Sequence, residues 1–123
     1  MKIAQLLHAS ILVLDVAVAR AFYEGVLGLV PSMKRPDLNF PGVWFEFGAQ
    51  QIHLIGLAQE KVTVHHEHGG RDQHIALSVD DIDALKTKLE AAGVVYTLSR
   101  SGRRALFCRD PDGNALEFVE VKT

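Results

Sequence analysis

Apolar and polar residues alternate in two similar stretches of the chain, LLHASILVLD at residues 6–15 and DQHIALSVDD at residues 72–81. An alternation with a period of two is typical of a β-strand that buries one face. Each stretch carries one histidine, and an aspartate follows it seven residues later. The two histidines, His8 and His74, are 66 residues apart. This repetition predicts that one structural unit occurs twice in the chain.

A helical pattern follows each alternating stretch. Apolar residues recur every three or four positions in DVAVARAFYEGVLG (15–28) and in DDIDALKTKLEAAG (80–93), which is the period of an amphipathic helix. Aspartate is a favoured first cap of a helix and glycine a favoured stop. The expected caps are Asp15 and either Asp80 or Asp81, and the expected stops are Gly28 and Gly93.

Three strand-like segments follow each helical pattern, and residues 110–113 (DPDG) form an expected hairpin turn between the last two. The order strand, helix, strand, strand, strand predicts an α+β fold of two tandem βαβββ units in a single domain, residues 1–123. The first unit takes residues 1–57, a polar linker residues 58–71, and the second unit residues 72–123. The expected strands after the helices are 29–40, 43–48 and 51–57 in the first unit, and 94–99, 103–110 and 114–121 in the second.

Four polar residues occupy matching places in the first and last strands of the two units: His8, His53, His74 and Glu117. By alternation each shares its face with mostly small residues, while bulky apolar residues take the opposite face. Three imidazoles and one carboxylate suit a divalent ion such as Zn, Fe, Mn, Co or Ni. Because each unit supplies two of these side chains, we expect them to hold one metal ion together. Each histidine taken alone is as readily explained by a hydrogen-bonded or half-exposed residue.

The segments LLHASILVLDVAVARAFYEGVLGL, HIALSVDDIDALKTKLEAAG and FCRDPDGNALEFVE resemble the vicinal oxygen chelate superfamily, which includes glyoxalase I, extradiol dioxygenases and bleomycin-binding proteins. The resemblance covers essentially the whole chain. It implies two βαβββ units that close a curved mixed sheet around a metal site. His8, His74 and Glu117 match the ligand positions of the metal-dependent members. His53 departs from the pattern, because this position resembles a glutamate in glyoxalase I and a glutamine in methylmalonyl-CoA epimerase.

The function that the resemblance implies is a metal-dependent lyase or isomerase of the glyoxalase type. One divalent ion would chelate two neighbouring oxygens of a small substrate and stabilise an enolate-like intermediate. Glu117, or a metal-bound water, would move the proton. With His53 in place of a carboxylate, Glu117 is the only acid of the set, which argues against ordinary glyoxalase I activity. The alternatives are a non-catalytic binding or resistance protein, a thiol transferase, an extradiol dioxygenase, or a closed structural zinc site.

Other side chains extend this hypothesis. Arg103, Arg104 and Trp44 are candidate substrate-binding residues, and Glu46 is a further base if it faces inward. Three histidines of the linker (His65, His66 and His68) fit a solvated loop better than a second metal site, although a lid hinged at the following glycines is an alternative.

Composition and charge restrict the partners and the cellular compartment that we expect. The net charge of −2 without a basic stripe argues against a nucleic-acid partner, and no apolar run is long enough for a membrane span. Cys108 is the single cysteine, expected to be buried and inert, and a chain without disulfides suits the cytoplasm. By analogy with the family we expect a homodimer that acts on a small molecule, either anionic or thiol-conjugated.

Overall fold

The computed structural model describes residues 1–57 and 67–122. Its elements follow the order expected for a repeated unit, with one strand fewer in the first half than in the second. The first half comprises β1 (His8–Val13), α1 (Val16–Arg20) with a π-helical continuation (Ala21–Val26), β2 (Gly42–Phe47) and β3 (Gln50–Gly56). The second half comprises a 3-10 turn (Gly69–Arg71), β4 (His74–Val79), α2 (Ile82–Ala91), β5 (Tyr96–Leu98), β6 (Ala105–Arg109) and β7 (Ala115–Glu120).

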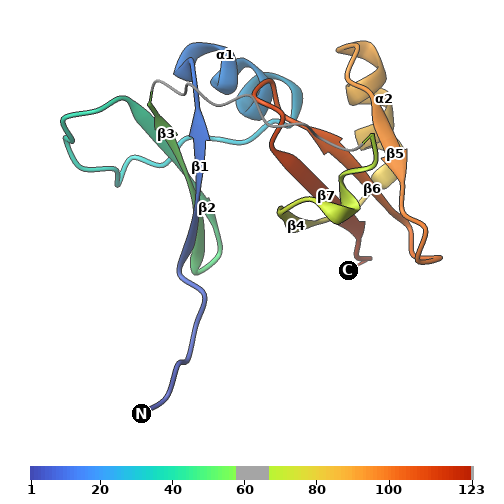
Figure 1. The fold of residues 1–123 in the computed structure, drawn as a ribbon, viewed down its shortest axis with the longest axis horizontal. Coiled ribbons are helices and arrows are strands. Elements are labelled where there is room, and N and C mark those ends of the chain that lie inside the picture. Colours follow the sequence, from blue (N-terminus) through green and yellow to red (C-terminus); the bar gives the residue numbers. More distant parts are fainter. Residues whose placement is uncertain (58–66, 123) are drawn as a thin grey trace.

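The strands form two mixed sheets that lie in separate halves of the ribbon (Figure 1). The first sheet has the order β1-β3-β2 and the second the order β4-β7-β6-β5. In each sheet the first and last strands of the unit are parallel, and the hairpin strands are antiparallel. The α+β class predicted from the sequence is therefore confirmed.

The predicted strand over residues 29–40 is wrong. Within this range the structure has a single β-bridge, between Pro31 and Phe45, and the backbone N–H of Ser32 donates to the carbonyl oxygen of Trp44. The physical reason lies in Pro31 and Pro36, because proline has no N–H to offer a sheet. The first sheet consequently lacks the counterpart of β5.

Both helices begin where the sequence predicts. The side chain of Asp15 accepts hydrogen bonds from the first turn of α1, and Asp81 does the same for α2. The helices stop near Gly28 and Gly93, which have positive φ angles of 76° and 70°. The sequence gives no sign of the π-helical turn, in which the N–H of residue 27 reaches back five residues to the carbonyl of residue 22.

One apolar core spans both halves of the chain. Val13, Phe45 and Leu54 from the first half belong to the same buried cluster as Leu106 and Leu116 from the second. Both helices contribute to this cluster, so the core lies on the helix-bearing face of the sheets. The opposite faces of β1 and β4 are exposed.

The turn at residues 110–114 joins the two halves. Its buried Asp110 accepts the hydroxyl hydrogen bond of Tyr23 at 2.7 Å. Asp112 accepts from the backbone N–H of Leu14, and the amide of Asn114 donates to the carbonyl oxygen at position 12. Burial raises the pKa of Asp110, while its hydrogen bonds oppose that shift. These contacts hold the end of β1 against the second unit.

Glu120 couples β7 to α2 and gives a pH-dependent prediction. Its carboxylate accepts from Arg104 at 2.7 Å and from the backbone N–H of Ile82 at 3.0 Å, and the Arg104 hydrogen bond is the main reason its pKa falls to about 2. We expect Glu120→Gln to lower the melting temperature at pH 7. A depressed pKa stabilises the fold above the unfolded value of about 4.3, so this advantage is lost as the pH falls toward 2.

Thermal unfolding of both proteins from pH 7 to pH 2 tests this expectation, with the exposed Asp80→Asn as the control variant. A gap in melting temperature that stays constant over that range would contradict it.

Among the described residues, no helix has the length and apolar character that a membrane crossing requires.

Candidate metal centre

The first pair of predicted ligands comes together on the exposed face of the first sheet. His8 in β1 pairs in register with Gln51, two positions from His53 in β3, so all three side chains share one face. The rings of His8 and His53 stack with centroids 4.1 Å apart. On its other side His53 stacks on Trp44 at 3.9 Å.

The environment of His53 favours a neutral imidazole. Its pKa is lowered chiefly by burial, and then by the neighbouring positive groups His8 and Arg35. Its Nε2 lies 2.8 Å from Oε1 of Gln51. Because that oxygen can only accept, Nε2 carries the proton and Nδ1 keeps its lone pair. A neutral imidazole is the form that binds a metal ion.

The second pair occupies the equivalent place in the second sheet. His74 in β4 pairs in register with Ala115, two positions from Glu117 in β7, which repeats the register of the first sheet. Nε2 of His74 lies 3.3 Å from Oε1 of Glu117. Nδ1 of His74 donates to the backbone carbonyl oxygen of Asp72 at 2.9 Å. Glu117 is 5% exposed, so its carboxyl group is buried.

The geometry of this second pair fits a divalent ion. Metal-binding histidines commonly donate their other ring N–H to a carbonyl or carboxylate, as His74 does to Asp72. In the neutral ring this leaves the lone pair of Nε2 facing a carboxylate oxygen. Two ligand atoms on a tetrahedral Zn²⁺ lie about 3.3–3.6 Å apart. The observed 3.3 Å is compatible with a cation shared between His74 and Glu117, and equally with a direct contact between the two side chains.

Of the two arginines predicted to bind substrate, one adjoins this pair. The guanidinium of Arg103 donates to Oε2 of Glu117 at 3.0 Å and is itself half exposed. Arg104 instead pairs with Glu120 and with Asp83 of α2. Arg103 is therefore placed to meet an anionic ligand beside Glu117, and the contacts of Arg104 are with the helix-bearing side of the sheet.

The structure does not bring the four predicted ligands together. Within residues 1–57 and 67–122, no three histidine, cysteine or acidic side chains lie close enough to hold one ion. The pair His8–His53 belongs to one sheet and the pair His74–Glu117 to the other. A groove of about 380 Å³ lies between β1 and β4, and His74 opens into it. Each chain thus carries two separate pairs of candidate ligands, one on each sheet.

Sequence reasoning missed three residues of this surface and left a fourth undecided. Gln51 precedes His53 by two positions, so strand alternation could have identified it as a neighbour on the same face. Glu46 pairs in register with Gln51 and therefore lies on that face as well, which settles the orientation that the sequence left open. Ser32 and Lys34 hold the Glu46 carboxylate and lower its pKa. The backbone oxygen of Asp72 and the ring of Phe107, in edge contact with His74, left no signal in the sequence.

The histidines of the linker divide into two groups. His65 and His66 lie outside the described residues. His68 is packed rather than solvated, because Nδ1 lies 2.6 Å from the hydroxyl of Thr97 and its ring contacts Phe107 edge to face. For His68 the expectation of a solvated loop is therefore wrong.

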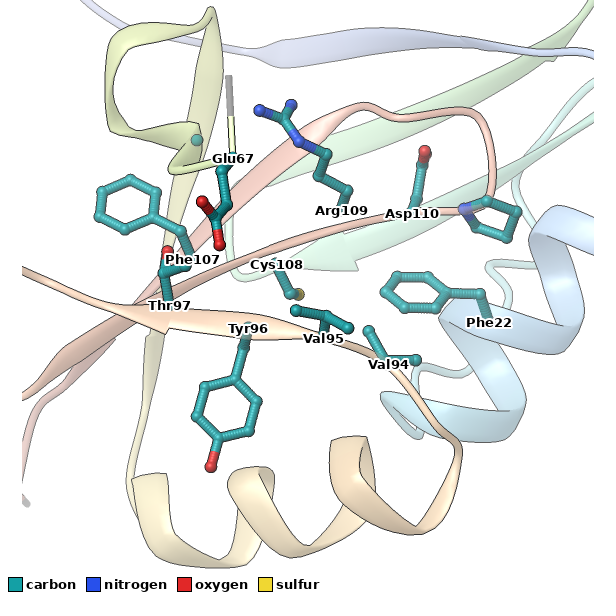
Figure 2. Close-up of a pocket in the computed structure, with 12 residues that line it drawn as sticks. Phe22, Glu67, Val94, Val95, Tyr96, Thr97, Phe107, Cys108, Arg109 and Asp110 are labelled. Carbon is teal, nitrogen blue, oxygen red and sulfur yellow. The ribbon is translucent and has the colours of Figure 1, made fainter. Parts of the chain in front are cut away.

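A separate cavity of about 350 Å³ lies at the outer edge of the second sheet, where β5 diverges from β6 (Figure 2). Phe22, Val94 and Cys108 line it, together with Glu67 and Arg109. Burial raises the pKa of the Cys108 thiol to about 12, so it remains protonated at neutral pH. This confirms that Cys108 is buried and gives no support for thiolate chemistry in the cavity.

Two mixed sheets, in each of which the parallel first and last strands of the unit carry a pair of polar residues, define a protein of the vicinal oxygen chelate class. The chain belongs to the Glyoxalase/Bleomycin resistance protein/Dioxygenase superfamily, which it matches over residues 5–118. This confirms the resemblance seen in the sequence.

Individual relatives in sequence and in structure carry glyoxalase names. Over 124 residues the chain is 30% identical to "Glyoxylase I 4" of Arabidopsis thaliana, covering 96% of this chain and 71% of the relative. It is 30% identical to "Lactoylglutathione lyase" of Haemophilus influenzae, covering 97% and 94%. The solved structure of a lactoylglutathione lyase from Agrobacterium tumefaciens superposes with a TM-score of 0.66 at 27% identity, covering 97% and 95%. The chain is thus similar along its whole length to proteins with a glyoxalase-like role.

Proposed function

We propose that this protein is a metal-dependent lyase or isomerase of the glyoxalase type that acts on a small substrate with two neighbouring oxygens. The observation that carries the proposal is the His74–Glu117 pair, whose ligand atoms are 3.3 Å apart and whose histidine is fixed by a hydrogen bond to Asp72. The buried Glu117 carboxyl group bonds Arg103 through Oε2 and leaves Oε1 facing Nε2 of His74, so these two atoms are available to share an ion. The neutral His53 beside His8 supplies the complementary half-site.

A homodimer completes the site. His8 of one chain and His74 of another are exposed on strands with the same register, each beside its buried partner, His53 or Glu117. A twofold axis would bring such faces together twice, giving two complete sites from two chains. Each site would then contain three imidazoles and one carboxylate.

The residues have distinct roles in the proposed reaction. The ion would be held by His8 and His53 of one chain and by His74 and Glu117 of the other. The chemistry supplied by a bound divalent ion is Lewis-acid polarisation of two neighbouring substrate oxygens, which favours the enolate-like form of the substrate. Glu117 accepts the substrate proton on Oε2, the oxygen that Arg103 now bonds. Arg103 then binds the anionic part of the substrate, and Trp44 forms an apolar wall.

Trp44 gives a direct test of metal binding. It is the single tryptophan of the chain and stacks on His53 at 3.9 Å, so its fluorescence reports on this half-site. We expect Co²⁺ or Ni²⁺ to quench it in a titration that saturates at one ion per chain. The matched variant His53→Gln should lose this response. If elemental analysis shows one bound ion per chain while the Trp44 fluorescence stays unchanged, the metal binds elsewhere. That result would contradict the proposed ligand set.

The substrate class is tested with the metal-loaded protein. Three kinds of substrate are assayed: hemithioacetals that α-ketoaldehydes form with glutathione or other thiols, catechols, and fosfomycin together with a thiol. Although His53 stands in place of a carboxylate, the similarity to lactoylglutathione lyases leads us to expect turnover of a hemithioacetal, lost in Glu117→Gln. Turnover of catechols alone would move the assignment to dioxygenase chemistry. A tightly bound ion with no turnover of any substrate would support a closed structural site and overturn the lyase or isomerase proposal.

A further inference from the structure

The residues before β1 form an exposed apolar segment, residues 1–7, which we call the N-terminal arm. Figure 1 shows it running away from the rest of the fold. Ile3, Leu6 and Leu7 are 88%, 67% and 63% exposed, and Met1 is fully exposed. One backbone hydrogen bond, from the N–H of Gln51 to the carbonyl of Leu7, fixes its inner end in line with β1. A row of large apolar side chains in water is typical of a surface that contacts a partner.

The second unit shows what the equivalent segment does when it is packed. Residues 67–73 precede β4 as the arm precedes β1, at the same distance of 66 residues. There the 3-10 turn lies on β6 and β7, so closely that a Cβ atom at Gly69 would be 3.1 Å from the Cβ of Ala115. His68 covers the ring of Phe107. In the second unit this segment therefore packs over a sheet, whereas the N-terminal arm runs away from the sheet of its own unit (Figure 1).

The arm also borders an open hollow. A space of about 410 Å³ is lined by Ala4, Gln5 and Leu6 of the arm and by Phe47, Ala49 and Gln50 at the β2–β3 turn. Leu6 and Phe47 give this hollow an apolar wall that would accept an apolar side chain.

We propose that the N-terminal arm docks on a second copy of this chain and stabilises the dimer. The arm leads directly into His8, so its partner is the chain whose His74–Glu117 pair meets His8; the choice of a second copy thus rests on the proposed function. Seven extended residues reach about 23 Å, which is long enough to cross the neighbouring sheet of that copy. The arm thereby buries on the partner the apolar side chains that its own fold leaves in water.

The dissociation constant of the dimer tests the proposal. Sedimentation equilibrium compares the wild type with Ile3→Ser and Leu6→Ser, and with Lys2→Ser as the matched polar variant of the same arm. Loss of one buried apolar side chain weakens association about tenfold. A twofold dimer loses it twice, so we expect the dissociation constant to rise about 100-fold in each apolar variant and to stay within about threefold of the wild type in Lys2→Ser. Far-UV circular dichroism should show the same fold in all four proteins.

Metal content measured in the same samples separates this proposal from the proposed function. The role of the arm is overturned if none of the three substitutions changes the dissociation constant of the dimer, or if the wild type is monomeric. Either result holds whatever the metal content. If the apolar variants associate more weakly but bind one ion per chain once a high protein concentration re-forms the dimer, both proposals are supported. Weakened association in a protein that never binds metal supports the arm and overturns the metal site.

Discussion

Glu117→Gln is expected to abolish stoichiometric metal binding at micromolar ion concentrations, with a fall in affinity of roughly 100-fold or more, since even loss of a residue that only supports a ligand costs 10–100-fold. The substitution keeps the shape of the side chain and removes the one negative charge of the proposed ligand set. It also removes the charge that pairs with Arg103 at 3.0 Å. His8→Ala should have a comparable effect through the other half-site.

Elemental analysis after dialysis against each of Zn, Ni, Co, Mn and Fe(II) measures this effect. Glu24→Gln is the matched control, because this glutamate pairs with Arg20 on the helix of the first unit and is far in sequence from every proposed ligand. Retention of about one ion per chain by Glu117→Gln would remove Glu117 from the site.

Asp110→Ala should have the largest effect on stability. The carboxylate accepts four hydrogen bonds, from the backbone N–H groups of Asp112 and Asn114, from the Asn114 amide and from the Tyr23 hydroxyl. Alanine leaves these donors without their acceptor inside the protein, where each unsatisfied group costs about 1–3 kcal/mol. Allowing for entry of water, we expect a loss of about 3–5 kcal/mol and a fall in melting temperature of roughly 12–19 °C.

Urea and thermal unfolding measure this loss, and the exposed Asp80→Ala, expected to stay within about 0.5 kcal/mol of the wild type, is the control. Tyr23→Phe removes one of the four donors and should cost about 1 kcal/mol. A loss below 1 kcal/mol for Asp110→Ala would mean that the turn does not hold the two units together.

Local patterns predicted the second unit almost completely. The alternation around His74 and the turn at residues 110–113 appear in the structure where the sequence placed them, and the helix cap is Asp81, one of the two candidates. Periodicity and turn chemistry act over a few residues, so they can be read from the chain directly. The strand expected over residues 29–40 failed because apolar content was given more weight than Pro31 and Pro36.

The candidate site could be predicted only as far as each sheet. The internal repeat indicated that His53 lies beside His8 and Glu117 beside His74, since an equal register follows from an equal unit. The relative position of the two sheets depends on long-range contacts such as that of Asp112 with the Leu14 N–H. Neither those contacts nor the proposed pairing of two chains is encoded in any local pattern, so the sequence could not reveal that the two pairs of candidate ligands lie apart within one chain.

A mixture of two inactive variants tests the shared site most directly. His8→Ala and Glu117→Gln should each fail to bind metal when alone, because every site in either homodimer lacks one ligand. When equal amounts are mixed and allowed to exchange subunits, half of the dimers should be mixed, and each of these carries one intact site. We therefore expect metal content and hemithioacetal turnover to recover to about a quarter of the wild-type values. No recovery, although subunit exchange is demonstrated with labelled chains, would contradict a site built from two chains.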